Sequence, residues 1–206
     1  MLLKNISLIL FVMLPCVVLS QGVTLDKGQS GAAILYGYSD ADDGTVKSGT
    51  FVNTTKGFFD LGVTIASIDP DGFGDNISLI GVQAELYPLR ESNNGGGVPI
   101  NLSLIGIWSN TGPNNTTGYG FGGSVFKRVK LGESAFISPI FSLVKLWPLG
   151  SDYGSEWVTE FDFPLVIKAS PKLRISLTPS FTSSESQDLS SIFFGITFVG
   201  VKKAKE

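Results

Sequence analysis

The sequence predicts an all-β protein, a closed antiparallel up-and-down transmembrane β-barrel of about ten strands. The chain of 206 residues is 43% hydrophobic but only 16% charged, whereas soluble domains carry about 25% charged residues. After the first twenty residues no apolar run reaches the roughly 18 residues of a spanning helix. Apolar and polar residues alternate instead, which is typical of strands with one side against lipid.

The first twenty residues have the composition of a secretory signal peptide. Lys4 precedes an apolar run over 6–19, and the small residue Ser20 follows it, as signal cleavage sites require. We therefore expect removal of residues 1–20, a barrel over 21–201 and a short basic tail over 202–206. A lipid anchor on Cys16 is the alternative, which the preceding Pro15 disfavours.

Five alternating runs occupy the first half of the mature chain. The run 57–68 places Phe59, Leu61, Val63 and Ile65 on one parity and Asp60, Gly62 and Thr64 on the other. The run 77–89 places Ile80, Val82, Ala84 and Leu86 opposite Gln83, Glu85 and Tyr87. The runs 32–38 and 45–53 are shorter, so eight spanning strands is the alternative to ten. The fifth run is 99–109.

Five further runs complete the predicted barrel: 118–130, 135–147, 156–168, 172–182 and 189–201. In 172–182 the apolar parity is Leu173, Ile175, Leu177, Pro179 and Phe181. In 156–168 it is Trp157, Phe161, Phe163, Leu165 and Ile167, and in 189–201 it is Ile192, Phe194, Ile196 and Phe198. Several runs reach the 9 to 11 residues of a tilted spanning strand.

The connections alternate in length. Short periplasmic turns and longer outer loops are typical of such barrels. Placing the C-terminus in the periplasm assigns 40–44, 69–76, 110–117, 148–155 and 183–188 to the outside and 54–56, 91–98, 131–134 and 169–171 to the inside. The Gly-rich connection 91–98 is long for an inner turn.

Four aromatic residues on the apolar parity lie beside predicted outer loops: Trp108, Tyr119, Trp147 and Trp157. Indole and phenol rings favour the headgroup level, where they form an aromatic girdle. Three core tryptophans in a soluble sandwich are the competing interpretation. Lys145, two residues before Trp147, is expected to extend its ammonium to a lipid phosphate.

Acidic residues gather at the predicted outer loops, and most cations lie at the other end of the strands. Ten of the eighteen acids fall there: Asp40, Asp42, Asp43, Asp69, Asp71, Asp75, Asp152, Glu156, Glu185 and Asp188. Asp69, Asp71 and Asp75 are candidate ligands for Ca²⁺ or Mg²⁺, since hard cations bind carboxylate oxygens. A plain hairpin turn is the alternative for this Pro- and Gly-containing segment. No other cofactor is predicted.

Charged residues on the inward parity predict a lumen in which opposite charges pair. Glu160 and Asp162 lie two residues apart, and Lys168, Lys172 and Arg174 lie on the same or the adjacent strand. Pairing avoids leaving a buried charge uncompensated. A catalytic role for these carboxylates is the alternative, disfavoured because the chain has no histidine to transfer protons near neutral pH. The sequence therefore predicts a non-enzymatic protein.

By its signal peptide, its Gly-rich alternating strands, its short inner turns and a last strand containing Phe194, Ile196 and Phe198, the chain resembles the outer membrane protein β-barrel domain family of Gram-negative bacteria. The resemblance implies an outer-membrane location, contact with outer-membrane lipids including lipopolysaccharide, and assembly by the insertion machinery. That family ends in an aromatic residue, whereas this chain continues to Glu206.

The expected function is a structural or interaction role, or a very narrow, porin-like pore. Barrels near eight strands are largely filled by their own side chains, and Tyr87, Phe126 and Arg128 are expected to obstruct this one. The rival is a secreted soluble β-sandwich or lipocalin-like binding protein. The formal net charge of −3 argues against a nucleic-acid partner. The sequence identifies neither a ligand nor an oligomeric state.

Overall fold

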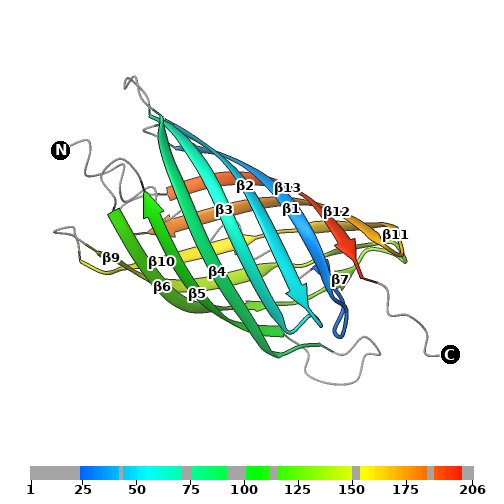
Figure 1. Cartoon of the computed structure of the whole chain (residues 1–206). Helices are drawn as coiled ribbons and strands as arrows, with labels where there is room; N and C mark the ends of the chain where they lie inside the picture. The colour runs from blue at the N-terminus through cyan, green and yellow to red at the C-terminus, as the bar shows by residue number, and fades with distance from the viewer. Residues whose placement is uncertain are drawn as a thin grey trace.

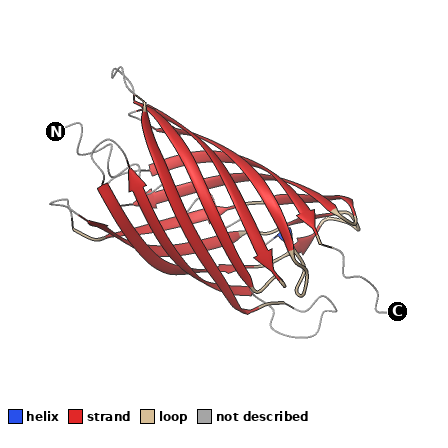
Figure 2. Ribbon diagram, in the orientation of Figure 1, coloured by secondary structure: helices blue, strands red, loops and turns tan. Residues whose placement is uncertain are grey.

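The computed structural model describes residues 24–41, 44–70, 76–91, 101–111, 116–149, 154–184 and 188–200. These residues form one antiparallel sheet that closes on itself, with strands running obliquely around a barrel (Figures 1 and 2). Oblique strands are required when a twisted sheet closes. No helix within the described residues is long and apolar enough to cross a membrane.

Thirteen strand segments build the sheet. They are β1 (Gly31–Ala41), β2 (Gly44–Thr55), β3 (Phe59–Pro70), β4 (Ile77–Leu89), β5 (Asn101–Thr111), β6 (Thr116–Phe126), β7 (Val129–Lys130), β8 (Ala135–Ile137), β9 (Ile140–Leu149), β10 (Glu156–Asp162), β11 (Leu165–Ser170), β12 (Leu173–Ser184) and β13 (Asp188–Val199).

Three pairs of consecutive segments, β6–β7, β8–β9 and β10–β11, are single strands with a local interruption. Two of the interruptions contain Pro139 and Pro164, which have no N–H for the ladder. Hydrogen bonds still cross the interruptions: Lys127 N donates to Pro139 O at 3.3 Å, and Ser138 N donates to Pro164 O at 3.0 Å. The sheet therefore has ten strands, as predicted from the sequence.

Closure occurs between the first and last strands. β1 pairs with β13 from Gly31↔Val199 to Asp40↔Ser190, and β12 links β13 to β10 and β11. The strands β1 and β2 have 11 and 12 residues, so the first hairpin is as long as the others. The eight-strand alternative is wrong, and the single closed sheet also rules out the two-sheet sandwich.

The predicted parities are confirmed along the strands. On β12, Leu177 and Phe181 face outward, 43% and 51% exposed, while Thr178 and Ser180 are buried. Other outward side chains are similarly apolar and open, such as Ile65 at 65% and Phe121 at 61%. An apolar surface around a closed barrel is what a hydrocarbon environment stabilises, and it is the reverse of the usual soluble arrangement.

Glycine has a packing role at two lumen positions. A methyl group on Gly37 would overlap the ring of Phe193, and one on Gly120 would overlap the Leu146 side chain. Both glycines therefore let a large neighbour lie close to the barrel wall, in line with the use of glycine where a side chain needs room.

Candidate functional site at the inner mouth of the barrel

The interior differs from one end to the other. We call the end where β1 begins and β13 ends the inner end. Toward the other, outer end, the lumen holds the outer apolar cluster, whose buried members are Val46, Ala66, Ile68, Leu79, Ile105, Ile107, Val144, Leu146, Val158 and Leu189. Nearer the inner end, Tyr87, Phe126 and Ile140 form a second apolar group, with Tyr87 and Phe126 edge to face at 6.0 Å between ring centroids.

Two carboxyl groups meet at Tyr87 in the lumen. The Tyr87 hydroxyl lies 2.9 Å from Asp60 Oδ2 and 2.7 Å from Glu85 Oε2, and all three side chains are buried. A phenol has a single proton to donate, so the second short contact needs a proton from a carboxyl group. This cluster is consequently a buried hydrogen-bonded group, with the guanidinium of Arg90 5.0 Å from the centroid of the Tyr87 ring.

A short chain segment covers the inner mouth. Residues 24–29, the N-terminal segment, precede β1, and Thr24 and Leu25 are 1% and 0% exposed. Thr24 Oγ1 lies 3.4 Å from Thr197 Oγ1 on β13. The segment turns at Gly28, whose φ of +87° suits glycine, and Gly28 N donates to Lys56 O at 2.8 Å. The turn between β2 and β3 thus anchors the segment across the mouth.

Three arginines, Arg90, Arg128 and Arg174, form the arginine cluster that holds this segment. Arg90 Nη2 donates to Leu25 O at 2.7 Å, and Arg128 Nη2 donates to the same carbonyl. Arg128 Nη1 lies 2.6 Å from Asp26 Oδ1, and Arg174 Nη2 lies 2.9 Å from Asp26 Oδ2. One carboxylate therefore bridges two guanidinium groups, in the charge-assisted geometry that makes strong hydrogen bonds.

The electrostatics of Asp26 follow from this bridge. Burial alone would raise the pKa of Asp26, but Arg128 and Arg174, with a smaller effect of Lys168, outweigh burial and hold the pKa below 3.8, its usual value. Asp26 is therefore ionised at neutral pH.

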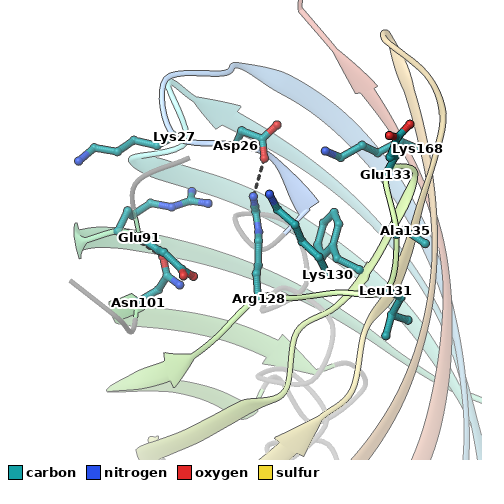
Figure 3. A pocket seen from close by; sticks show the side chains of 13 residues that line it. Asp26, Lys27, Glu91, Asn101, Arg128, Lys130, Leu131, Glu133, Ala135 and Lys168 are labelled. Atoms are coloured by element: carbon teal, nitrogen blue, oxygen red, sulfur yellow. Dashed lines mark hydrogen bonds and ion pairs between the residues drawn. The ribbon is translucent and has the colours of Figure 1, made fainter. Parts of the chain in front are cut away.

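A cavity of about 790 Å³ opens beside the bridge. Figure 3 shows Arg128, Lys130 and Lys168 extending toward the side of the cavity where Asp26 lies. Phe136 forms part of the wall, with the guanidinium of Arg128 4.8 Å and the ammonium of Lys168 5.9 Å from its ring centroid. Contact with the ring face of an aromatic residue favours a cation in such a position.

The structure places the four predicted girdle residues on neighbouring strands near the outer end. Trp108 pairs with Tyr119 across β5 and β6, and Tyr119 stacks on Trp147 at 5.5 Å between ring centroids. Lys145, which pairs with Trp157 in the ladder, has its Nζ 5.5 Å from the ring of Trp147 and 5.3 Å from that of Trp157. Sequence parity thus located one continuous aromatic patch.

The charges expected to pair in the lumen lie instead in two groups. Glu160 and Asp162 are buried, and Ser180 donates to Glu160 Oε1 at 3.1 Å. Arg174 lies opposite Lys168 in the ladder of β11 and β12 and contacts Asp26 and Gln29. Lys172 is exposed at the turn before β12. The prediction relied on closeness in sequence. Ser180, which contacts Glu160, lies six residues along β12 from Arg174, so the two groups of charges are separated along the lumen.

The predicted cation ligands are only partly within the described residues. Asp69 is exposed at the end of β3, whereas Asp71 and Asp75 lie outside the described residues. Within the parts of the chain that the structure describes, no three acidic, histidine or cysteine side chains lie close enough together to hold a metal ion. Glu156, assigned to the outer loops, points inward and is buried.

Sequence reasoning missed the N-terminal segment and the roles of Arg90 and Arg174 in holding it. The position of the segment depends on its turn at Gly28 and on its side-chain contacts. It is not a strand, so its sequence shows no alternating pattern. The available signal was that Asp60, Glu85 and Arg174 lie at inward-facing positions of their strands. This pattern predicts that their charges enter the lumen, but it does not predict which groups they pair with.

No family model matches the sequence, and no curated protein matches it. Solved structures with a similar shape include the KdgM porin in complex with disordered oligogalacturonate, at 8% identity and TM-score 0.46, covering 81% of this chain and 98% of that one. The β domain of the Bordetella autotransporter BrkA has 10% identity and TM-score 0.47, covering 85% and 100%. The Escherichia coli outer membrane protease OmpT has 8% identity and TM-score 0.42, covering 87% and 100%.

These similarities are too weak to transfer an activity. The class of the molecule follows from its own geometry, which combines a sealed antiparallel cylinder, an apolar outer surface and charges confined to the lumen and the rims. The chain is a closed ten-stranded antiparallel β-barrel with an apolar outer surface.

Proposed function

We propose that this chain is a non-enzymatic integral outer-membrane barrel whose lumen is closed to solutes, so that its role is structural or interactional. The outer apolar cluster is the observation that carries this proposal. Its members come from β2, β3, β4, β5, β9, β10 and β13, and they include Val144, Leu146 and Val158, each at most 2% exposed. Narrow apolar constrictions exclude water and with it dissolved ions.

The inner end supports the same conclusion by a different means. The N-terminal segment lies across the mouth, with Leu25 fully buried and its carbonyl bonded to Arg90 and Arg128. A solute entering from this end would have to displace hydrogen bonds from charged donors, which are worth about 1.5–3 kcal/mol each.

A non-enzymatic role fits the chemistry of the lumen. The chain has no histidine, and three of its buried carboxyl groups have hydrogen-bond partners: Ser180 for Glu160, and Tyr87 for both Asp60 and Glu85. These contacts compensate buried polar groups.

Location and partners complete the proposal. Residues 1–20 would be removed on secretion, and the insertion machinery would assemble the barrel among outer-membrane lipids including lipopolysaccharide. The ammonium of Lys145 between Trp147 and Trp157 supports contact with a lipid phosphate at the headgroup level. Asp69, Asp71 and Asp75 would bind Ca²⁺ or Mg²⁺ at the outer rim.

The test is ion conductance of the purified barrel in planar bilayers. We expect wild type to show no stable channel, because both ends are closed. Leu146→Ser combined with Asp26→Asn weakens both closures and should raise the conductance. Leu177→Ser with Asp26→Asn is the matched control, since Leu177 faces outward and its change leaves the lumen intact. Stable conductance of the wild type contradicts the proposal.

A further inference from the structure

We propose that the cavity at the inner mouth is a binding site for a soluble oxyanion with two negative charges, of which inorganic phosphate is the simplest case. The site lies between Arg128, Lys130 and Lys168, beside the Asp26 bridge. It does not depend on whether the outer end of the lumen is closed.

The first argument is the balance of charge around the cavity. Its lining contains five cations, Lys27, Arg90, Arg128, Lys130 and Lys168, against three acids, Asp26, Glu91 and Glu133. Arg174 adds a further cation behind Asp26. Glu91 lies 4.0 Å from Lys127, and Glu133 is exposed on the turn after β7. Asp26 is thus the carboxylate that bridges Arg128 and Arg174, and the cations that line the cavity outnumber its acids.

The second argument is a buried donor without a partner. Arg174 is 4% exposed, and its Nη1 has no hydrogen-bond partner, although its Nη2 contacts Asp26 and Gln29. An unsatisfied charged donor in a buried position costs free energy. Arg174 does not line the cavity itself, so a ligand there would act on it through space. Additional negative charge beside Asp26 would offset part of this cost and the mutual repulsion of Arg90, Arg128 and Arg174.

The third argument is the arrangement of the cavity wall. Phe136 lies against the guanidinium of Arg128 and the ammonium of Lys168, which positions two cations on one side of the space before any ligand binds. Asn101, whose side-chain amide donates to Phe126 O at 3.2 Å, supplies a fixed polar group elsewhere in the cavity lining. Preorganised donors lower the entropic cost of binding.

The ligand is assigned to the soluble phase because of where the donors lie. Arg128, Lys130 and Phe136 follow the inward parity of their strands, as Phe126 does, and the cavity is next to the N-terminal segment. A lipid headgroup would approach from the outward face, where Lys127 lies 50% exposed. Phosphate is a mixture of monoanion and dianion at neutral pH and accepts several hydrogen bonds, which matches guanidinium and ammonium donors.

The experiment is isothermal titration of the full barrel, purified in a maltoside detergent, with inorganic phosphate. Chloride at equal ionic strength is the comparison ion. We expect saturable binding of phosphate at one site, weakened at least tenfold by Lys168→Gln and by Arg128→Gln. Lys172→Gln removes the same charge from the same mouth outside the cavity lining, so its affinity should match wild type.

Asp26→Asn should change the affinity for phosphate in the opposite direction. It removes the carboxylate that competes for Arg128 and Arg174, so the affinity for phosphate should rise several-fold. Heat-modifiable gel mobility shows which variants have folded, and if Arg128→Gln fails to fold, Lys168→Gln and Asp26→Asn still decide the question.

Three results would overturn the proposal. The first is an absence of saturable phosphate binding. The second is an equal loss of affinity in Lys172→Gln and Lys168→Gln, which would indicate general charge attraction. The third concerns a repeat of the titration with the barrel in vesicles: loss of phosphate binding in phosphatidylglycerol vesicles but not in phosphatidylcholine vesicles would indicate that a lipid headgroup occupies the site.

Discussion

The outer and inner ends of the lumen are filled by opposite means. At the outer end, side chains such as Val144, Leu146 and Leu189 pack against one another. At the inner end, Arg128 and Arg174 enclose the carboxylate of Asp26 and fix a chain segment in the mouth. The same alternation of inward and outward side chains thus encloses an apolar cluster at the outer end of the lumen and a charged cluster at the inner end.

The difference determines what each end responds to. Apolar packing depends on shape and is insensitive to pH and to moderate salt. Ion pairs depend on protonation and on competing ions. We therefore expect the outer end to fail only when its volume or polarity is changed, and the inner end to respond to solution conditions.

The largest effect is expected from a charge in the outer apolar cluster. Val144→Arg places a guanidinium at a position that is 1% exposed and surrounded by apolar side chains. An uncompensated buried charge costs about 3–5 kcal/mol. Urea unfolding of the barrel in lipid vesicles measures the loss, and Val144→Met, which adds no charge, should cost less than about 1.5 kcal/mol. Equal costs would show that volume, not charge, matters at this end.

The second largest loss of stability is expected from a charge on the outward, lipid-facing side of a strand. This change serves as a comparison for the changes made inside the lumen. Leu177→Arg on β12 should destabilise the barrel by about 2–4 kcal/mol if the residue lies near the bilayer centre. The adjacent inward change Thr178→Ala should be mild by comparison, because it introduces no charge and the Thr178 hydroxyl has no hydrogen-bond partner to lose. Equal tolerance of both changes in vesicle unfolding would contradict lipid exposure of this parity.

At the inner end, Arg174→Gln should release the N-terminal segment more than it destabilises the barrel. It removes the hydrogen bonds to Asp26 and Gln29, and each bond to a charged group is worth about 1.5–3 kcal/mol. Hydrogen exchange should speed up at residues 24–29 and stay slow in β12. The control Lys172→Gln, with an exposed side chain, should leave both rates unchanged.

The smallest effect is a pH dependence confined to the inner end. Because the pKa of Asp26 lies below 3.8 in the folded barrel, its contribution to stability is present above that value. The contribution is lost as the pH falls through the lower folded-state pKa. Wild type should exceed Asp26→Asn in unfolding free energy by about 1 kcal/mol at neutral pH, and by less near pH 2. The difference between wild type and Val144→Met should not change over the same range.

Local pattern was enough to predict much of the barrel. The alternation along β4 and β12 gave their strands to within two residues, with Ile77 and Leu89 as the ends of β4, because a period of two is a local property of extended chain. The breaks before β7, β9 and β11 were not predicted. They depend on where Pro139 and Pro164 meet neighbouring strands, which is a property of the register.

The candidate site was less predictable than the fold. Arg128 and Lys168 were recognised as inward charges. Asp26, however, lies 102 residues before Arg128 and 148 residues before Arg174 in the sequence, and it contacts both arginines. The alternation along a strand predicts whether a charged side chain faces the lumen or the outside. It does not predict which charged side chains from other strands lie at the same height in the closed barrel.

The sequence by itself determined that the chain forms strands, which side chains face outward and where the large aromatics gather, since each of these follows from the composition and period of a single strand. Only the tertiary structure decided how the lumen is divided and which charges pair. Tilted strands closing into a cylinder bring residues together according to register and stagger, and these are set by the assembly of all ten strands at once.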